Sequence, residues 1–391
     1  MASFSLPEPQ SDPLLALIGK YRADNREDKI DLGVGVYRDN NGETPVLAAV
    51  KAAEDMLLKD QGSKSYLGLT GDIDFVDAYG DVVFGATSRI VSGAQTPGGS
   101  GALRLAAEVF KTAFPDNTLW IGLPTWPNHL PLTESAGIKT ATYEYFDVQT
   151  QQILFDQMMQ TLSQATAGDA VLLHGCCHNP TGADLSPVQW QQVSQVLAQR
   201  SLLPIIDLAY HGLGRGMAQD LEATRLITEQ NPHTLVATSC SKNFGMYRDR
   251  VGAVYIASES DELARRCQAL FGYVARRMYS MPPDHGAAVV RIILANDTLR
   301  KQWTNELDVM ANRVISLRNT VAGEGSRLNL QFVAQQSGMF SLLPLSPAQV
   351  DSMIDDHAVY MAGNGRINIA GCQVSQIPKL IDALEQVGFS L

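Results

Sequence analysis

The chain has 391 residues, of which 45% are hydrophobic and 18% charged, so it is long enough for two or three folded domains with a sizeable core. Its formal net charge of -11 would repel nucleic acid and anionic membrane surfaces, and no apolar run approaches the roughly 20 residues that a membrane span needs. The five cysteines are an odd number without a repeated spacing, which argues against a disulfide framework.

The start of the sequence, residues 1–24, has no basic segment followed by an apolar one, which is the pattern of an export signal. Together with the cysteine usage, this predicts a cytoplasmic protein. Because no block rich in lysine or arginine interrupts the acidic chain, we expect small-molecule partners and neither nucleic acid nor a membrane.

A first helix is expected to start at Asp12 and Pro13. Farther along, short apolar runs with β-branched residues are typical of strands that are buried on both faces: residues 119–122, 170–174, 203–207, 235–238 and 251–256. Helical stretches lie between these runs, and one of them begins with Ser186 as its cap and Pro187 in its first position. Alternating strands and helices predict an α/β fold with a mostly parallel sheet flanked by helices.

Apolar residues recur every three or four positions from Leu299 to Val321, which predicts one amphipathic helix of about two dozen residues. The helix should end at the glycines of residues 323–325. Strand-like runs and a closing helix around residues 380–387 follow, and they indicate a small α+β domain that also includes the N-terminal helix. We therefore predict a large domain and a small domain built from both chain ends: residues 45–309, and residues 1–44 with 310–391.

A glycine-rich turn, Thr-Pro-Gly-Gly-Ser-Gly at residues 96–101, directly precedes a helix-forming segment that begins at Ala102. Free N–H groups at a helix N-terminus can bind an anion, so the turn is a candidate phosphate site, although a plain glycine turn has the same composition. It has neither the Walker nor the dinucleotide spacing. It also approximates the nucleophile elbow of an α/β-hydrolase, with Ser100, Asp207 and His285 in order, but no strong strand is predicted before it.

Chemically active side chains gather at or just beyond the ends of the predicted strands. They are Asn179, Asp207, Tyr210, Lys242 and Arg250. Ligands of open α/β sheets bind in the crevice outside the carboxyl ends of the strands, so we expect these residues to share one site.

The tract Cys176-Cys177-His178 contains residue types that bind metals. Zinc ligands usually come as pairs separated by two to four residues, and the sequence has no second pair. We therefore interpret the tract as a buried strand end and predict no metal.

Several motifs together point to a family. "HNPTG", "DLAYHG", "SCSKNFGMYRDRVG" and "GRINIAG", with "TWPNH" and "TPGGSGALR" upstream, resemble the aspartate and aromatic subgroup of the fold-type I aminotransferases, which use pyridoxal 5'-phosphate. The resemblance extends in order from "DKIDLGVGVYRD" to the final helix. It implies a large cofactor-binding domain, a small domain, and a homodimer with shared active sites.

The resemblance assigns the central chemistry to a few residues. Lys242 is the position that forms the Schiff base with the cofactor and then moves a proton. Asp207 matches the aspartate that pairs with the pyridine nitrogen and raises its pKa, and His129 matches the histidine that hydrogen-bonds this aspartate. Asn179 and Tyr210 match the groups that hold the phenolic oxygen of the cofactor.

Other positions match the residues that hold the rest of the cofactor. Trp126 matches the ring that stacks on the cofactor. The phosphate would be bound by Gly99, Ser100, Ser239 and Arg250. Tyr66 matches a tyrosine that reaches the phosphate in the neighbouring subunit, which is why the resemblance implies a homodimer.

Two arginines carry substrate recognition in the resemblance. Arg366 matches the arginine that grips the α-carboxylate, where planar two-point binding favours arginine over lysine. Arg276 matches the arginine that takes the side-chain carboxylate in the other subunit's site. Further substrate contacts are implied for Gly35, Trp126, Asn179, Ser280 and Phe340.

Two departures bear on specificity. Aspartate-specialised members commonly carry Thr where Ser100 stands and Asn where Met281 stands, and methionine is an adaptable apolar side chain. The expected reaction is therefore a ping-pong transfer of an amino group between aspartate or an aromatic amino acid and 2-oxoglutarate. The competing hypotheses are a serine hydrolase and an amino-acid-binding protein without catalysis, and neither gives Lys242 a covalent role.

Overall fold

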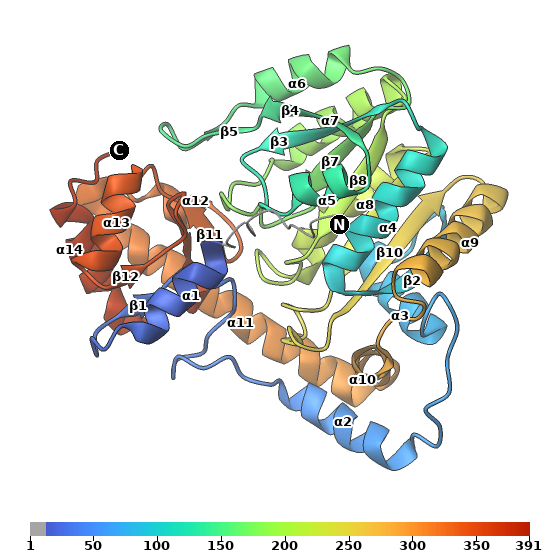
Figure 1. The fold of residues 1–391 in the computed structure, drawn as a ribbon, viewed down its shortest axis with the longest axis horizontal. Coiled ribbons are helices and arrows are strands. Elements are labelled where there is room, and N and C mark those ends of the chain that lie inside the picture. Colours follow the sequence, from blue (N-terminus) through green and yellow to red (C-terminus); the bar gives the residue numbers. More distant parts are fainter. Residues whose placement is uncertain (1–12) are drawn as a thin grey trace, which may run out of the picture.

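The computed structural model describes residues 13–391, so Asp12 of the predicted helix start lies outside the described residues, and α1 (Pro13–Ala23) begins at Pro13. In Figure 1 a large body with a central sheet lies beside a smaller body that holds α1 and the C-terminal elements, drawn in dark orange and red. The long helix α11 (Asp297–Glu324) runs from one body into the other (Figure 1). None of the helices in residues 13–391 combines the length and the apolar composition that a membrane-spanning helix needs.

Within the described residues, seven strands form the main sheet. Their spatial order is β2 (Ile90–Pro97), β10 (Val251–Ser258), β9 (His233–Ser239), β8 (Leu203–Leu208), β7 (Ala170–His174), β3 (Thr118–Leu123) and β4 (Lys139–Glu144). Strand β10 runs antiparallel to both of its neighbours, β2 and β9, and the remaining pairings of the sheet are parallel. All five predicted runs are strands of this sheet, and the mostly parallel α/β fold is confirmed.

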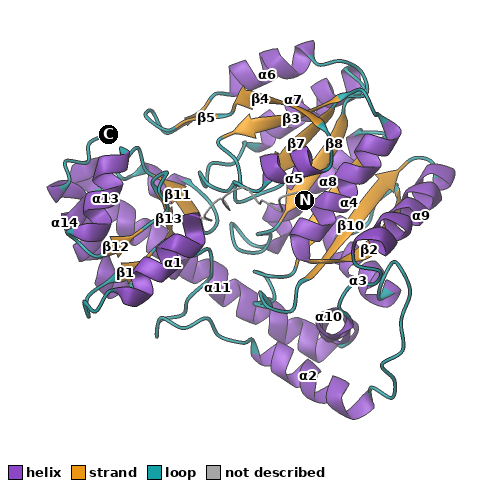
Figure 2. Ribbon diagram, viewed as in Figure 1, coloured by secondary structure: helices purple, strands orange, loops and turns teal. Residues whose placement is uncertain are grey.

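The sheet is covered by helices on both faces (Figure 2). Successive residues of one strand belong to different cores, as Ile205 and Ile206 of β8 show. This explains the unbroken apolar runs, because side chains alternate between the two faces of a strand and both faces are buried here. The helices of the large body are α2 (Ala48–Asp60), α3 (Ile73–Phe84), α4 (Gly98–Ala113), α5 (His129–Ser135), α6 (Phe155–Gln164), α7 (Pro187–Gln199), α8 (Met217–Gln230), α9 (Asp261–Met278) and α10 (Asp284–Ala295).

Two predicted helix ends are confirmed. The Ser186 hydroxyl accepts a hydrogen bond from the backbone N–H of Gln189, and the Gln189 side chain accepts one from the backbone N–H of Ser186, so α7 starts in a reciprocal capping box. Helix α11 ends at Glu324 and is capped by Gly325. Its length of 28 residues exceeds the prediction because it starts at Asp297, after the cap Asn296, and continues past Val321 to Glu324.

The small body has its own core. Leu17 of α1 and Ile30 of β1 (Ile30–Asp31) belong to one apolar cluster with Ile354, Leu380 and Leu384. Its other elements are α12 (Phe332–Gln335), β11 (Phe340–Leu342), α13 (Pro347–Asp355), β12 (Val359–Tyr360), β13 (Arg366–Asn368) and α14 (Ile377–Gln386). Strand β1 pairs with β12 and β11 with β13. The two chain ends thus build one unit, while the boundaries predicted at 44/45 and 309/310 stay a prediction.

Arg318 of α11 fixes the strand β11 that faces the large body. Its guanidinium is fully buried and donates to the backbone oxygens of Val333, Ser337, Gly338 and Phe340 and to the hydroxyl of Ser341. Five acceptors on one short segment hold the backbone on both sides of Phe340. The placement of that phenyl ring therefore depends on the long helix as well as on its own strand.

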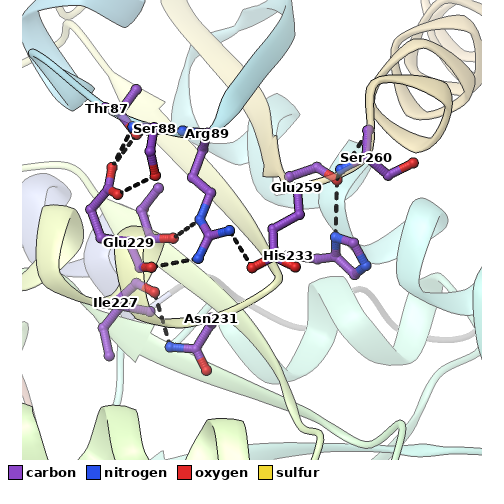
Figure 3. Close-up of polar contacts among 11 residues, drawn as sticks. Thr87, Ser88, Arg89, Ile227, Glu229, Asn231, His233, Glu259 and Ser260 are labelled. Atoms are coloured by element: carbon purple, nitrogen blue, oxygen red, sulfur yellow. Dashed lines mark hydrogen bonds and ion pairs between the residues drawn. The ribbon is translucent and has the colours of Figure 1, made fainter.

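The edge of the sheet at which β9 begins and β10 ends is closed by a polar cluster, which Figure 3 shows. Arg89 donates to the backbone oxygens of Thr228 (3.0 Å) and Glu229 and pairs with Glu259. The carboxylate of Glu229 accepts from both the backbone and the hydroxyl of Ser88. No residue predicted for the active site lies in this cluster, so its role is to hold the sheet at the end opposite the carboxyl ends of the parallel strands.

Candidate active site

A cavity of about 140 Å³ lies at the carboxyl ends of the parallel strands. Because β10 is antiparallel, Arg250 at its start reaches the same edge as residues that follow β7, β8 and β9. The cavity brings together nine of the predicted residues: Gly99, Ser100, Trp126, Asn179, Asp207, Tyr210, Ser239, Lys242 and Arg250. It is also lined by Leu103, Ala209 and Ser241, which the sequence analysis did not single out.

One part of this cavity is built for an anion. Helix α4 begins at Gly98 without a side-chain cap, so its first backbone N–H groups have no capping side chain. Arg250 lies against this turn, since a Cβ on Gly98 would be 2.5 Å from the Arg250 Nη2, and Gly98 has a φ of +71°. Arg250 also donates to the hydroxyl of Ser241 (3.2 Å). A guanidinium, hydroxyls and a helix N-terminus together favour a phosphate.

The prediction that no strong strand precedes this turn was wrong. Strand β2 runs from Ile90 to Pro97 and leads directly into α4, which starts at Gly98 and not at Ala102. The buried half of β2 is Gly93 to Thr96, which are small or polar residues. The strand is held by its eight-residue pairing with β10, so its own sequence carries little hydrophobic signal.

The hydrolase arrangement is absent among the described residues. Asp207 bonds to His129, and His285 lies on α10, where it is half exposed and 3.7 Å from Glu54. A serine nucleophile needs its base within hydrogen-bond reach, and His285 is no part of the cavity. Ser100 is therefore left as an anion-binding hydroxyl.

Lys242 is a buried amine in a cavity. Its pKa is lowered from 10.5 to about 8, chiefly by burial; Asp207 opposes this change and the nearby Arg250 adds to it. Its Nζ lies 4.9 Å from the centre of the Tyr210 ring. A lysine with this pKa keeps a usable fraction of neutral amine near neutral pH, which both a nucleophile and a proton-transfer base require.

This burial predicts a stability cost. We expect Lys242→Met to stabilise the cofactor-free protein at pH 7 by up to about 3 kcal/mol, the free energy that corresponds to a pKa of about 8 in the folded and 10.5 in the unfolded chain. The cost is constant below pH 8, because both states are protonated there. It falls as pH rises from 8 to 10.5, because only the folded state then loses its proton.

Chemical denaturation of both proteins at pH 7 and pH 10 measures this difference. The control is Lys139→Met, an exposed lysine whose removal should change stability equally little at both pH values. An advantage of Lys242→Met that is as large at pH 10 as at pH 7 would contradict the assigned cause.

Asp207 is held as an anion by its neighbours. His129 Nε2 donates to Asp207 Oδ2 (3.1 Å), and the hydroxyl of Thr125 donates to His129 Nδ1 (2.7 Å). Burial alone would raise the pKa of Asp207, but the hydrogen bond from His129 and the nearby positive charge of Lys242 help to lower it below its usual value. Burial and His129 lower the pKa of His174 to about 3, so this neighbouring ring stays neutral. The carboxylate is therefore available as a fixed negative charge.

A hydrogen-bonded chain joins the large body to the small one. Asn179 Nδ2 donates to the hydroxyl of Tyr210 (3.2 Å), and Arg366 Nη1 donates to Asn179 Oδ1 (3.3 Å). Arg366 Nη2 donates to the backbone oxygen of Gly33 (2.9 Å), while its buried Nε has no partner within the described residues. An arginine with an unused donor at a cavity wall can bind a carboxylate.

Phe340 completes this wall. Its ring lies 4.4 Å from the Arg366 guanidinium carbon and meets the Tyr210 ring edge-on at 5.7 Å. A Cβ on Gly35 would be 3.0 Å from the Phe340 ring, so Gly35 also lies here. The structure thus brings Gly35, Arg366 and Phe340 together with the residues of the cavity.

Three predicted residues lie away from the cavity and from the residues packed next to it. Tyr66 is 88% exposed, and Arg276 and Ser280 are also exposed. Among residues 13–391, the Arg276 side chain has no hydrogen bond or ion pair, whereas Arg277 lies over the Tyr273 ring at 4.5 Å. Nothing in a single chain places these residues in its own site.

The cysteine tract is a buried strand end, as the sequence suggested. Cys176 and Cys177 are buried, and burial contributes to raising the pKa of both thiols. Their sulfurs lie within 4.8 Å of the Asp220 carboxylate, so the three groups are close enough together to bind one metal ion. That carboxylate, however, already accepts from the backbone N–H groups of Gly212, Gly214 and Arg215, so it closes a turn.

Two residues of the site, Ser241 and Thr125, were missed from the sequence, although the sequence contains a signal for each. Ser241 lies between Ser239 and Lys242 and carries the same hydroxyl as its predicted neighbour. Thr125 stands beside Trp126 in "TWPNH", and only the fold shows that it holds His129. Leu103 follows Ser100 by about one helical turn, so helix geometry could have found it.

The donor set fits pyridoxal 5'-phosphate. An uncapped helix start with Arg250 and hydroxyls suits its phosphate, an ionised Asp207 suits a protonated ring nitrogen, and a buried Lys242 suits its aldehyde. Asn179 and Tyr210 offer donors to a phenolic oxygen.

Comparison with known proteins agrees with this fit. The chain matches the family described as aminotransferase class I and II over residues 27–384. It is 49% identical over 381 residues to the tyrosine aminotransferase of Rhizobium meliloti (strain 1021), which covers 96% of this chain and 97% of that protein. It is 40% identical over 386 residues to the aspartate aminotransferase of Escherichia coli (strain K12), covering 96% of this chain and 98% of that protein.

The fold agrees as well. The crystal structure of the aromatic-amino-acid aminotransferase from Burkholderia pseudomallei covalently bound to pyridoxal phosphate superposes with a TM-score of 0.95 and 35% identity, covering 99% of this chain and 100% of that one.

Proposed function

Because the chain belongs to the class I and II aminotransferases, we propose that it moves an amino group between aspartate or an aromatic amino acid and 2-oxoglutarate, with pyridoxal 5'-phosphate as its cofactor. The observation that carries this proposal is the buried Lys242 in one cavity with an ionised Asp207 and an anion-binding turn. The hydrolase and binding-protein hypotheses explain neither the lysine nor Arg250.

When bound, pyridoxal phosphate holds the amino group of the substrate and accepts the electron pair that remains when the α-proton leaves. The chain's own residues supply the rest. Lys242, as a neutral amine, would take this proton from the α-carbon of the substrate and deliver it to the cofactor carbon that carries the aldehyde. Asp207 supplies the negative charge that keeps a ring nitrogen protonated, and His129 fixes the direction of that carboxylate.

Further residues orient the reactants. We assign the phosphate to Gly99, Ser100, Ser239, Ser241 and Arg250, because they line the anion-binding part of the cavity. Trp126, which meets His129 edge-on at 5.3 Å, is assigned to the face of the ring. Tyr210 keeps its proton, because burial raises the pKa of its phenol, so it can donate a hydrogen bond to the cofactor's phenolic oxygen.

Arg366 is assigned to the α-carboxylate that all amino-acid substrates share. Burial lowers the pKa of its guanidinium but leaves it charged at neutral pH, and its free Nε supports two-point binding. Asn179 and Gly35 lie next to it. Phe340 gives the substrate an apolar neighbour at the same wall.

The exposed side chains support a homodimer with shared sites. Large apolar residues are exposed near Tyr66 and Arg276: Leu67, Leu69, Tyr273 and Met278. A surface of this kind on a globular protein favours association. In the proposed dimer, Tyr66 and Arg276 of each subunit complete the site of the other, with Ser280 beside Arg276.

Ser100 and Met281 favour dual use of dicarboxylic and aromatic substrates, and the two relatives described above carry names of both kinds. The test compares kcat/KM for aspartate and for phenylalanine, each with 2-oxoglutarate. Arg276→Ala should lower kcat/KM for aspartate by about 10²-fold and change kcat/KM for phenylalanine far less. Only aspartate has a side-chain carboxylate, and this carboxylate loses its partner in the variant.

No turnover of phenylalanine or tyrosine by the wild-type protein would remove the aromatic part of the proposal. An equal loss for both substrates in Arg276→Ala would remove the assignment of Arg276. Sedimentation of the wild-type protein tests the dimer separately. The cytoplasmic location expected from the cysteine usage remains a prediction.

A further inference from the structure

Two segments that are distant in the sequence form one exposed arm, which consists of residues 61–71 and 276–284. The backbone N–H of Leu67 donates to the Met281 Sδ (3.2 Å), and the Gln61 amide donates to the Asp284 carboxylate (3.0 Å). The arm carries Tyr66 in its first half and Arg276 in its second. In the proposed dimer it is therefore the part of a subunit that completes the partner's site.

A single buried side chain, Gln95 of β2, fastens both halves of the arm. Its side-chain oxygen accepts from the backbone N–H of Asp72 (2.9 Å), directly after the first half. Its side-chain nitrogen donates to the backbone oxygen of Pro283 (2.6 Å) in the second half. Its backbone N–H adds a bond to the oxygen of Thr70 (2.9 Å). Since one end of the amide accepts and the other donates, only one orientation of the side chain satisfies both halves.

The packing around Gln95 is tight. A Cβ on Gly71 would lie 2.4 Å from the Gln95 Oε1 and 2.8 Å from the Pro282 Cγ, and Gly71 has a φ of +77°. Both halves of the arm and Gln95 thus meet at one point where only a glycine fits. A change in the Gln95 side chain must therefore move at least one half.

Gln95 also belongs to the strand that leads into the subunit's own cavity. Strand β2 ends at Pro97, and the residues that follow it, Gly99 and Ser100, line the cavity. The arm that serves the partner and the turn that serves the subunit itself are thereby fixed to the same strand.

We propose that Gln95 is a positioning residue that sets how each subunit presents Arg276 and Tyr66 to the active site of its partner, and so determines recognition of a side-chain carboxylate. This inference rests on the proposed dimer and its assignment of Arg276. An arginine binds a carboxylate through two parallel hydrogen bonds, so a shift of the arm weakens this contact first. The α-carboxylate is bound by Arg366, which belongs to the small body and not to the arm.

The first test replaces Gln95 by methionine, which keeps its length but loses both hydrogen bonds. In the half-reaction without an oxo acid, we expect the apparent affinity for aspartate to fall about tenfold, while that for phenylalanine changes less than about twofold. The matched control is Gln268→Met on α9, which removes a side-chain bond to Gly93 of the same strand (3.2 Å) but none to the arm. It should leave both affinities unchanged.

The second test uses hybrid dimers, separated by different affinity tags. One subunit carries Lys242→Ala with an intact arm, and the other carries Gln95→Met with an intact Lys242. The only competent site then receives the intact arm, so the wild-type affinity for aspartate should return. If the hybrid keeps the weakened affinity, Gln95 acts within its own subunit and the inference is overturned.

Two further outcomes separate this inference from the proposed function. If Arg276→Ala weakens aspartate binding but Gln95→Met does not, the inference fails alone. If the wild-type protein is a monomer, or Arg276→Ala has no selective effect, the proposed dimer fails and the inference fails with it. Should Gln95→Met not fold, Gln95→Glu serves instead, since it retains the acceptor for Asp72 and loses only the donor to Pro283; the same selective loss is expected.

Discussion

Lys242→Ala should lower the transamination turnover number by more than about 10⁴-fold, the upper end of what a general acid–base group contributes, because this amine also anchors the cofactor. The variant should fold and still bind the cofactor without a covalent bond, since Arg250 and the turn at Gly99 remain. Turnover and cofactor retention after denaturation measure the two effects separately.

Two controls make this result specific. Lys242→Arg keeps the positive charge but cannot act as a neutral base near neutral pH, so it should be as inactive as the alanine variant. An added small primary amine should restore part of the turnover of Lys242→Ala, because the cavity wall that held the side chain is then open. Undiminished turnover of either variant would show that another group moves the proton.

Asp207→Asn should lower the turnover number by about 10³-fold, the loss expected when a fixed charge no longer stabilises the transition state. The amide is nearly the same size as the carboxylate and can still accept a hydrogen bond from His129, so the fold should persist. What is lost is the negative charge that the His129 hydrogen bond helps to maintain. Substrate binding, which depends on Arg366, should change much less.

The control is His129→Gln, which can keep a donor toward Asp207 but alters its direction. Its loss should be at least about tenfold smaller than that of Asp207→Asn, because a positioning residue acts only through the charge it holds. Equal losses in both variants would mean that orientation, and not charge, is what the carboxylate contributes.

Much of the fold could be predicted because the buried strands coincide with unbroken apolar runs in the sequence. Residues 203–207 illustrate this, since alternate side chains enter two different cores. Strand β2 could not be found in this way, because its buried half from Gly93 to Thr96 is small or polar and depends on pairing with β10. The early start of α4 at Gly98 was missed for a related reason, since the approach of Arg250 to Gly98 is a tertiary contact.

Some residues of the site could likewise be predicted from the sequence, and others could not. Lys242 and Asp207 could be predicted because each lies close to a strand end, and parallel strands bring their ends to one edge. The link from Arg366 through Asn179 to Tyr210 could not, because it joins residues of both bodies. Gln95 had no signal at all: its importance arises only where residues 61–71 and 276–284 converge on it.

We expect one cavity to exchange an amino group through Lys242 and the cofactor. The most direct test records the absorption spectrum of the protein with bound pyridoxal phosphate after adding aspartate, and separately phenylalanine, without any oxo acid. We predict that either amino acid converts the spectrum to that of the amine form of the cofactor and that 2-oxoglutarate reverses the change. A spectrum that neither amino acid alters, although the cofactor is bound, would show that this cavity does not exchange an amino group with these substrates.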